Sequence, residues 1–179
     1  HWNRTIDVNL RGVVHGVHAA YPKMKARGRG QILNTASLAG LVSSPLSGPY
    51  SATKHAVVAL SLSLRPEAAL HGVRVSVLCP GVIDTPIFER ANDGLPQTAA
   101  GANARSLFHQ MATLLQGGKF YPPERLAADA VRGLETNAPV IVAPLGARLL
   151  WWLDRTSPSR VRDIISRLGF RRIKQRLGV

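Results

Sequence analysis

Apolar side chains recur along this 179-residue chain at helical spacing in three long segments. Between residues 4 and 26 they return every three or four positions, which predicts an α-helix with a wide buried stripe. A second helix is predicted over residues 50–70, which are rich in alanine, leucine and serine. A third is predicted over residues 123–136, because a proline and an acid suit a first helical turn.

Three shorter segments have the pattern of β-strands. Residues 31–36 have the pattern of a short buried strand, and residues 140–143 are a compact apolar run. Residues 73–78 alternate between β-branched and other side chains. The resulting order of helix, strand, helix, strand, helix, strand favours an α/β fold with parallel strands joined by crossover connections. Ligands of such sheets bind beyond the carboxyl ends of the strands.

The rest of the chain has weaker patterns. Residues 86–120 lack firm periodicity and predict a mobile segment with one short helix near residues 106–115. We expect substrate identity to depend mainly on residues 86–120 and 144–155. The predicted domain organisation is a folded domain over residues 1–153 and a basic amphipathic helix or tail over residues 154–179.

Composition and residue spacing add four constraints. A hydrophobic content of 45% suffices for one domain with a core. The single cysteine, Cys79, excludes an internal disulfide, favours a reducing cytoplasm and is expected to be buried in its apolar run. No apolar stretch reaches the ~20 residues of a membrane-spanning helix, and the histidines have no metal-binding spacing, so no metal is expected.

The net charge of +13 is concentrated at the end of the chain, because residues 155–179 carry eight basic residues and one acid. Apolar residues there follow helical spacing, at Val161, Ile164, Ile165 and Leu168. The helix could pack its apolar face on the domain, or it could lie on an anionic membrane. Nucleic-acid binding is the third alternative, but no nucleic-acid-binding motif supports it.

The candidate chemistry lies at the start of the second helix. Tyr50 and Lys54 are four residues apart, so a helix places them on one face, and Ser37 lies thirteen residues before the tyrosine. A neighbouring ammonium is expected to lower the pKa of the phenol, and a serine hydroxyl can hold a substrate oxygen. The alternatives are an ordinary helix-start tyrosine, a solvated lysine and a serine that caps a turn.

Four segments occur in an order that points to one family. They are Asp7-Val8-Asn9-Leu10 followed by Gly12, Asn34-Thr35-Ala36-Ser37 followed by Ala39-Gly40, Tyr50-Ser51-Ala52-Thr53-Lys54, and Pro80-Gly81 followed by Ile83 and Thr85. A Tyr-x-x-x-Lys pair alone occurs by chance in many chains. Together, at this spacing, the four segments closely resemble the motifs of the classical short-chain dehydrogenase/reductase family.

The resemblance implies a role for each residue. Tyr50 would be the catalytic acid/base, and Lys54 would lower its pKa and bind the nicotinamide ribose. Ser37 would orient and polarise the substrate carbonyl or hydroxyl, so Ser37 and Tyr50 would bind substrate. Asn9 would hold a water that links Lys54 to a proton relay, although a polar residue inside a helix often makes only structural bonds.

The segment after the second strand would hold the cofactor, which is NAD or NADP. The resemblance implies that the backbone of Pro80, Gly81 and Ile83 and the hydroxyl of Thr85 bind the nicotinamide carboxamide, together with Tyr50 and Lys54. Thr85 could instead cap a turn. The implied substrate is a small-molecule alcohol or carbonyl compound, and the implied assembly is a homo-oligomer.

Three family features are missing. The chain lacks the Gly-rich phosphate-binding loop, the residue that selects NAD or NADP, and the Asn-Asn-Ala-Gly strand motif. We therefore expect the carboxy-terminal half of a Rossmann-type doubly wound parallel sheet, truncated by roughly three βα units, or about 90 residues. The complete product would be an alcohol/carbonyl oxidoreductase, whereas this fragment alone would be inactive. The alternative is a non-catalytic, basic, membrane-associated remnant of the family.

Overall fold

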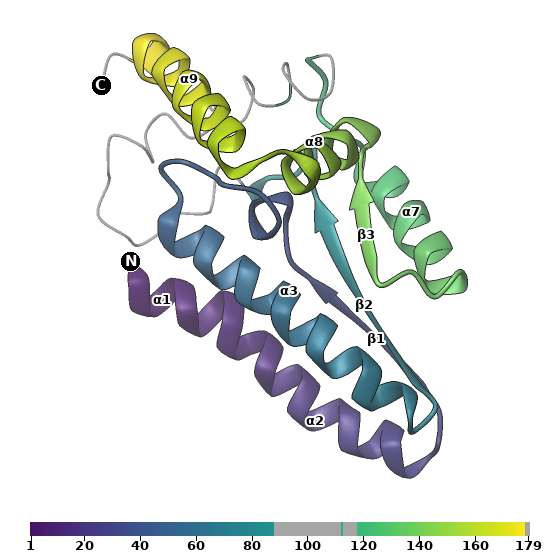
Figure 1. Cartoon of the computed structure of the whole chain (residues 1–179). Helices are drawn as coiled ribbons and strands as arrows, with labels where there is room; N and C mark the ends of the chain where they lie inside the picture. The colour runs from purple at the N-terminus through teal and green to yellow at the C-terminus, as the bar shows by residue number, and fades with distance from the viewer. Residues whose placement is uncertain (88–111, 113–117, 178–179) are drawn as a thin grey trace.

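A three-stranded parallel sheet forms the centre of the molecule (Figure 1). The structure, a computed structural model, describes residues 1–87, 112 and 118–177. The strands are β1 (Gly30–Thr35), β2 (Val73–Pro80) and β3 (Val140–Ala143), in the order β1-β2-β3. All three predicted strands are present within two residues of their predicted bounds, and both pairings are parallel, as the alternation of elements predicts.

Helices cover both faces of the sheet. The amino-terminal helix consists of α1 (Trp2–Ile6), a π-helical turn η1 (Asp7–Arg11) and α2 (Gly12–Ala26). Together with α3 (Gly48–Ala69) it covers one face, whereas α7 (Pro123–Glu135) covers the other (Figure 1). The helices predicted over 4–26, 50–70 and 123–136 are thereby confirmed, and the fold is a doubly wound α/β sheet.

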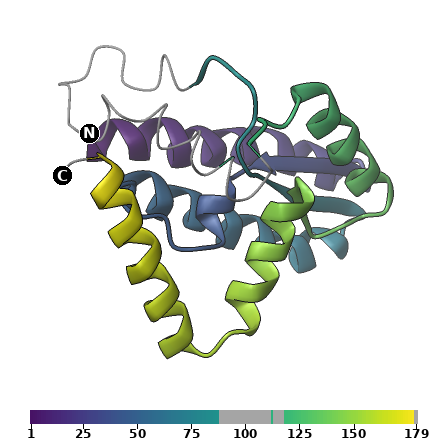
Figure 2. The ribbon, with the colours of Figure 1, turned by 90° about the horizontal axis from the view of Figure 1, so that it is seen from above.

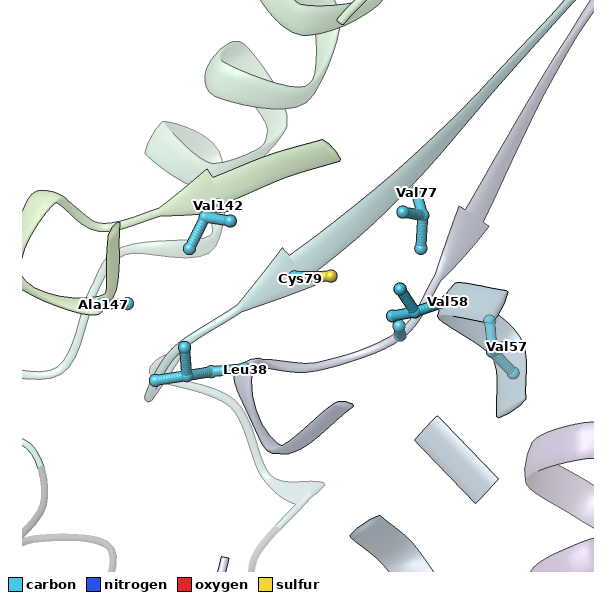
Figure 3. Packing of buried hydrophobic residues seen from close by; sticks show 8 residues of the cluster. Leu38, Val57, Val58, Val77, Cys79, Val142 and Ala147 are labelled. Atoms are coloured by element: carbon cyan, nitrogen blue, oxygen red, sulfur yellow. The ribbon is translucent and has the colours of Figure 1, made fainter. Parts of the chain in front are cut away.

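The alternating side chains of β2 divide the core into two parts. Val77 and Cys79 face α3 and pack with Val57, Leu38 and other buried residues (Figure 3). Leu78 faces the opposite way and packs with Ala130 and Ile141 between the sheet and α7. Cys79 is fully buried, as its apolar run predicts. It is the penultimate residue of β2 and so lies at the carboxyl end of that strand.

Polar contacts fix α3 on the sheet. Asn34 Nδ2 donates to Ser61 Oγ at 3.0 Å, so two buried polar side chains satisfy each other between β1 and α3. Arg65 donates to the Val75 carbonyl and, at 2.6 Å, to the carbonyl of Asn137 just before β3. These bonds tie the carboxy-terminal half of α3 to β1, to β2 and to the residue before β3.

Two helices follow β3: α8 (Leu145–Thr156) and α9 (Ser159–Leu177). The α9 helix was predicted from the spacing in the basic tail, but α8 was not. Its sequence nevertheless carries a helical signal, because Arg148 and Arg155 are seven residues apart and share one polar stripe of the helix. The boundary predicted between residues 153 and 154 falls inside α8, and the mobile segment and helix predicted within 86–120 lie almost wholly outside the described residues.

Candidate active site

The loop between β1 and α3 begins with Ser37 in extended conformation, followed by a 3₁₀ turn, η2 (Leu38–Gly40). Ser37 Oγ accepts a hydrogen bond from the Ala39 amide at 3.2 Å and so caps the turn. The same side chain lies close enough to the Tyr50 hydroxyl to lower the pKa of that phenol. The capping role that the sequence left open is therefore real, and it holds the serine where it also meets the tyrosine.

The turn η2 packs tightly against the first turns of α3. Ser51 Oγ donates to the Ala39 carbonyl at 2.7 Å. A Cβ atom on Gly40 would lie only 2.6 Å from the carbonyl oxygen of Lys54, which is closer than any real contact. Only glycine allows this approach, and the approach brings Ser37 beside the tyrosine and lysine of α3.

The Tyr50 phenol is enclosed by this loop, and burial raises its pKa above the ordinary value of 10.0. The hydrogen bond from Ser37 opposes the shift, and the charge of an ionised Cys79 thiol would add to it. The net shift is opposite to the lowering expected from a neighbouring ammonium, and its largest cause is burial of the phenol. Lys54 is not among the causes of the shift, so its expected effect on the Tyr50 pKa stays a prediction.

The Lys54 ammonium lies over the Tyr50 ring, 5.7 Å from the ring centroid, as the four-residue spacing on α3 predicts. Its Nζ donates to the carbonyl of Thr35 at the end of β1, at 3.1 Å. Burial lowers the pKa of this amine. The lysine thus joins the helix to the end of the strand and places its charge beside the phenol.

Asn9 lies in the π-helical turn η1, a type of irregularity that is frequent at functional sites. Its Nδ2 donates to Thr53 Oγ1 at 3.4 Å. The Thr53 hydroxyl in turn donates to the Tyr50 carbonyl at 2.8 Å. Asn9 therefore reaches the tyrosine through Thr53, a residue that the sequence analysis missed. A threonine three residues after the tyrosine on a helix is the signal that could have found it.

Cys79 lies below these groups. The Ser37 backbone hydrogen-bonds its thiol, and burial raises the pKa of that thiol to about 12. A thiol held neutral in this way is a poor nucleophile. It forms the apolar floor of the site, in agreement with the interpretation of Cys79 as a buried small side chain.

The segment predicted to bind the cofactor leaves the carboxyl end of β2. The Gly81 amide donates to the Ala143 carbonyl at 2.8 Å, so Gly81 is bound to β3. Ile83 forms a parallel bridge with Tyr121, in which the Asp84 amide donates to Tyr121 and the Tyr121 amide donates to the Val82 carbonyl, both at 3.0 Å. In this parallel pattern, the Val82 carbonyl and the Asp84 amide make the bonds to Tyr121, so the amide of Ile83 itself points away from Tyr121.

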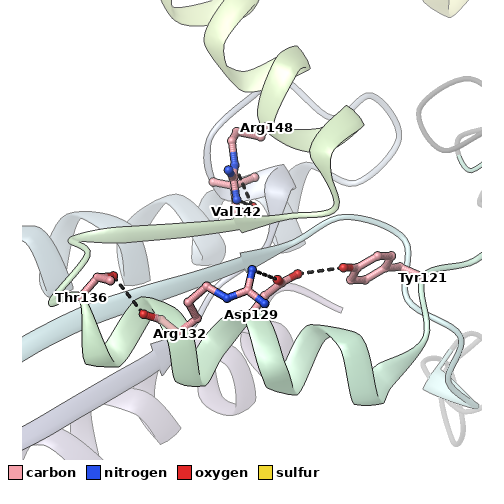
Figure 4. Close-up of polar contacts among 6 residues, drawn as sticks. All are labelled: Tyr121, Asp129, Arg132, Thr136, Val142 and Arg148. Atoms are coloured by element: carbon pink, nitrogen blue, oxygen red, sulfur yellow. Dashed lines mark hydrogen bonds and ion pairs between the residues drawn. The ribbon is translucent and has the colours of Figure 1, made fainter.

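Tyr121 is itself held by its side chain (Figure 4). Its hydroxyl donates to Asp129 Oδ2 on α7 at 2.8 Å, and this bond to a carboxylate raises the pKa of the phenol. Arg132 lies 3.7 Å from the other oxygen of the same carboxylate. The sequence offered no signal for this contact, because the three residues carry no motif.

The structure thus brings Ser37, Tyr50 and Lys54 together at one edge of the sheet and connects Asn9 to them through Thr53. The carboxyl end of the neighbouring strand β2 and the residues just after it contain Pro80, Gly81, Ile83 and Thr85. A buried phenol beside a hydroxyl and an ammonium can give or take a proton at a substrate oxygen. Such a site on a doubly wound parallel sheet is typical of a nucleotide-dependent oxidoreductase.

Comparison with known proteins identifies the family. The model of the short chain dehydrogenase family matches residues 1–96, and the chain belongs to this family. It is 43% identical over 89 residues to a D-beta-hydroxybutyrate dehydrogenase of Rhizobium meliloti (strain 1021), a match that covers 50% of this chain and 34% of the relative. Members of the family use NAD or NADP.

Solved structures agree with this assignment. The crystal structure of levodione reductase superimposes with a TM-score of 0.67 at 25% identity, covering 81% of this chain and 57% of that protein. A 3-oxoacyl-[acyl-carrier protein] reductase with bound NAD from Brucella melitensis gives a TM-score of 0.62 at 28% identity, covering 79% and 50%. Among curated relatives, the chain spans between 34% and 59% of their length.

Proposed function

We propose that the complete protein is an NAD(P)-dependent oxidoreductase that interconverts an alcohol and a ketone or aldehyde. The observation that carries this proposal is the meeting of three side chains from two separate segments. The Ser37 side chain lies beside the Tyr50 hydroxyl and lowers the pKa of the phenol, and the Lys54 ammonium lies 5.7 Å from the ring centroid of the same tyrosine. A phenol buried beside a hydroxyl and a cation, at the ligand-binding edge of a sheet, is more typical of a functional site than of ordinary packing.

In the proposed mechanism, Tyr50 gives its proton to the substrate oxygen during carbonyl reduction and takes one during alcohol oxidation. Its raised pKa keeps the phenol protonated at neutral pH, which suits the role of proton donor. Ser37 binds and orients the same substrate oxygen. Lys54 stabilises negative charge as it develops on the phenol, and Asn9 holds the helical turn of the tyrosine through Thr53.

The cofactor would be held by residues on the neighbouring strand end. No described residue hydrogen-bonds the Ile83 amide or the Thr85 hydroxyl, so both are open to a carboxamide. Lys54 has donors beyond its bond to Thr35 and would bind the ribose. These groups fit the nicotinamide half of NAD or NADP. When bound, the dinucleotide supplies or accepts the hydride.

The phosphate-binding part of the site has no counterpart in this sequence. No Gly-rich loop follows a strand in residues 1–179, so the proposed activity is that of the complete protein. Assays should therefore use the product of the native gene.

The test is Tyr50→Phe in the complete protein, assayed in both reaction directions with a panel of carbonyl compounds and alcohols. We expect kcat to fall by about 10²- to 10⁴-fold, the usual contribution of a general acid/base. Tyr21→Phe is the matched control, because Tyr21 is a half-buried tyrosine that packs against the core far from the site. Near-normal turnover in Tyr50→Phe would sink the proposal. Absence of turnover in the wild type would favour the non-catalytic alternative.

We further propose that the complete protein is a homo-oligomer. Val8 and Val14 on the amino-terminal helix and Leu62 on α3 are exposed apolar side chains on neighbouring helices. Light scattering with size-exclusion chromatography tests this directly, and a monomer at micromolar concentration would contradict it.

A further inference from the structure

The helix α8 has two apolar faces. On one face Ala147 is buried, and Leu150 and Trp151 pack against the core beside Cys79. On the other face lie Leu145, Leu149, Trp152 and Leu153, spaced at i, i+4, i+7 and i+8. Leu149 is 53% exposed and Trp152 is 60% exposed. Packing of the first face on the core explains why α8 lies against the sheet. Among the described residues, no hydrophobic cluster includes the side chains of the second face.

The helix α9 repeats this feature. Val161, Ile164 and Leu168 share one face at i, i+3 and i+7, and Ile164 and Leu168 are 56% and 53% exposed. One alternative drawn from the sequence was a helix that packs its apolar face on the domain. The structure contradicts that alternative for these three side chains. Figure 2 shows α8 and α9 as the two sides of a V that projects from the sheet and its covering helices.

We refer to residues 145–177, which form this V, as the arm. An ion pair between Arg162 and Asp154, 3.6 Å apart, joins its two helices. Arg155, Arg160 and Arg171 are exposed. From residue 145 to the end of the sequence there are nine basic residues and two acids, which give a formal charge of +7. The arm therefore combines exposed leucine, isoleucine and tryptophan with a strong positive charge.

We propose that the arm docks on an anionic lipid surface. An interfacial helix needs an apolar face that enters the acyl boundary and basic residues that meet lipid phosphates, and the arm supplies both. Each basic side chain near an anionic leaflet adds to the attraction, and the effect extends over about one Debye length. In the described part of the chain no helix is long and apolar enough to cross a bilayer, so the arm would lie in the plane of the interface.

Two other occupants of this surface are a second copy of the arm and a nucleic acid, and the charge and apolar side chains of the arm argue against both. A second copy of the arm would bring another charge of +7 against the first, which opposes self-association through this surface. A nucleic acid would match the charge but would leave the exposed leucine and isoleucine side chains without a partner. Of these three occupants, an anionic membrane is the one that complements both the positive charge and the exposed apolar side chains of the arm. The proposal does not depend on the proposed enzymatic activity.

The test is flotation of the complete protein with large unilamellar vesicles. We expect binding to vesicles of phosphatidylcholine and phosphatidylglycerol and little binding to phosphatidylcholine alone. We also expect weaker binding at high salt, because the ionic part is screened. A blue shift of tryptophan fluorescence on addition of anionic vesicles, reduced in Trp152→Phe, would place the apolar face of α8 in the lipid.

Variants separate the arm from the rest of the surface. Ile164→Ser/Leu168→Ser should lower the vesicle partition coefficient by at least about tenfold, since two apolar side chains no longer enter the bilayer. Arg160→Gln/Arg171→Gln should lower it by a similar factor for anionic vesicles only. Val131→Ser is the matched control, because Val131 lies on α7 and is 55% exposed, as Ile164 is on α9. All of these side chains are exposed, so thermal melting temperatures should stay within a few degrees of the wild type.

Five results would overturn the proposal. The first three are failure to float with anionic vesicles, equal binding to neutral vesicles, and an unchanged partition coefficient in Ile164→Ser/Leu168→Ser. The fourth is lipid-independent oligomerisation that this double variant abolishes, which would identify the surface as an interface between copies. Binding to duplex DNA or to transfer RNA in place of vesicles would assign the arm to nucleic acid and would equally refute docking on lipid.

Discussion

Replacing Gly40 by alanine tests the link between the loop and the helix that carry the candidate site. The added Cβ would lie 2.6 Å from the carbonyl oxygen of Lys54, 2.7 Å from its carbonyl carbon and 3.1 Å from its Cβ. Two of these three atoms belong to the helix backbone and cannot rotate away. Ordinary contact begins at 3.4 Å, so the loop and α3 must separate by about 0.8 Å, the difference between 3.4 Å and 2.6 Å.

The size of the effect follows from this displacement. Forcing a methyl group into a packed site typically costs about 1–3 kcal/mol. For a chain of this length, 1 kcal/mol corresponds to about 2–4 °C in melting temperature. We therefore expect Gly40→Ala to melt about 2–12 °C below the wild type. Because the shift moves Ser37 relative to Tyr50 and Lys54, kcat should also fall, by up to about 10²-fold.

The assay is thermal unfolding followed by circular dichroism, combined with steady-state turnover of the complete protein. Gly16→Ala is the control, because Gly16 is exposed within α2 and an added Cβ would meet nothing within 4 Å beyond its chain neighbours and its own helix backbone. This control should be neutral or stabilised by about 1 kcal/mol or less. A Gly40→Ala protein that melts within 1 °C of the wild type, or a Gly16→Ala protein that loses as much stability, would refute the argument.

Two further predictions concern Tyr121 and Cys79. Tyr121→Phe removes the hydrogen bond to Asp129, which holds the segment that bridges to Ile83. Loss of one such bond costs about 1 kcal/mol, so KM for the dinucleotide should rise by roughly fivefold. It should leave kcat nearly unchanged, and a fall in kcat at constant KM would contradict this role. The folded state keeps the Cys79 thiol protonated to about pH 12, whereas its ordinary pKa is 9.0. Its contribution to stability is therefore complete below pH 9.0 and falls by about 1.4 kcal/mol per pH unit above it. In urea unfolding, Cys79→Ala should be less stable than the wild type at about pH 8, by about 1–2 kcal/mol of lost packing, and the gap should narrow toward about pH 10. A constant gap would show that the thiol stays neutral in the unfolded chain as well.

The sequence predicted the main elements because their hydrophobic spacing survives in any tertiary context. The strand over residues 140–143 has the bounds predicted, and α3 begins two residues earlier than predicted. Two segments were not predicted, for different reasons. The helix α8 has a readable polar stripe at Arg148 and Arg155 that was overlooked. The turn η2 within the loop after Ser37 has no period of its own, because it is held by one capping serine and by contact with α3.

The identity of the site was also readable from the sequence, because residue types at set intervals on a helix and after a strand imply nearness. Tyr50 and Lys54 share a face as expected, and Ser37 reaches the tyrosine. The direction of the Tyr50 pKa shift was not readable. It depends on how much water the loop excludes from the phenol, and the loop closes only because Gly40 lets it approach α3.

The sequence by itself determined the fold class, the family motifs and the concentration of positive charge in the last 25 residues. These follow from local spacing and composition, which do not change when the chain folds. Only the tertiary structure decided that burial raises the pKa of Tyr50, that Thr53 connects Asn9 to the site, and that apolar side chains of α8 and α9 are exposed. Each of these depends on which segments, distant in sequence, exclude water from one another, and that is a property of packing.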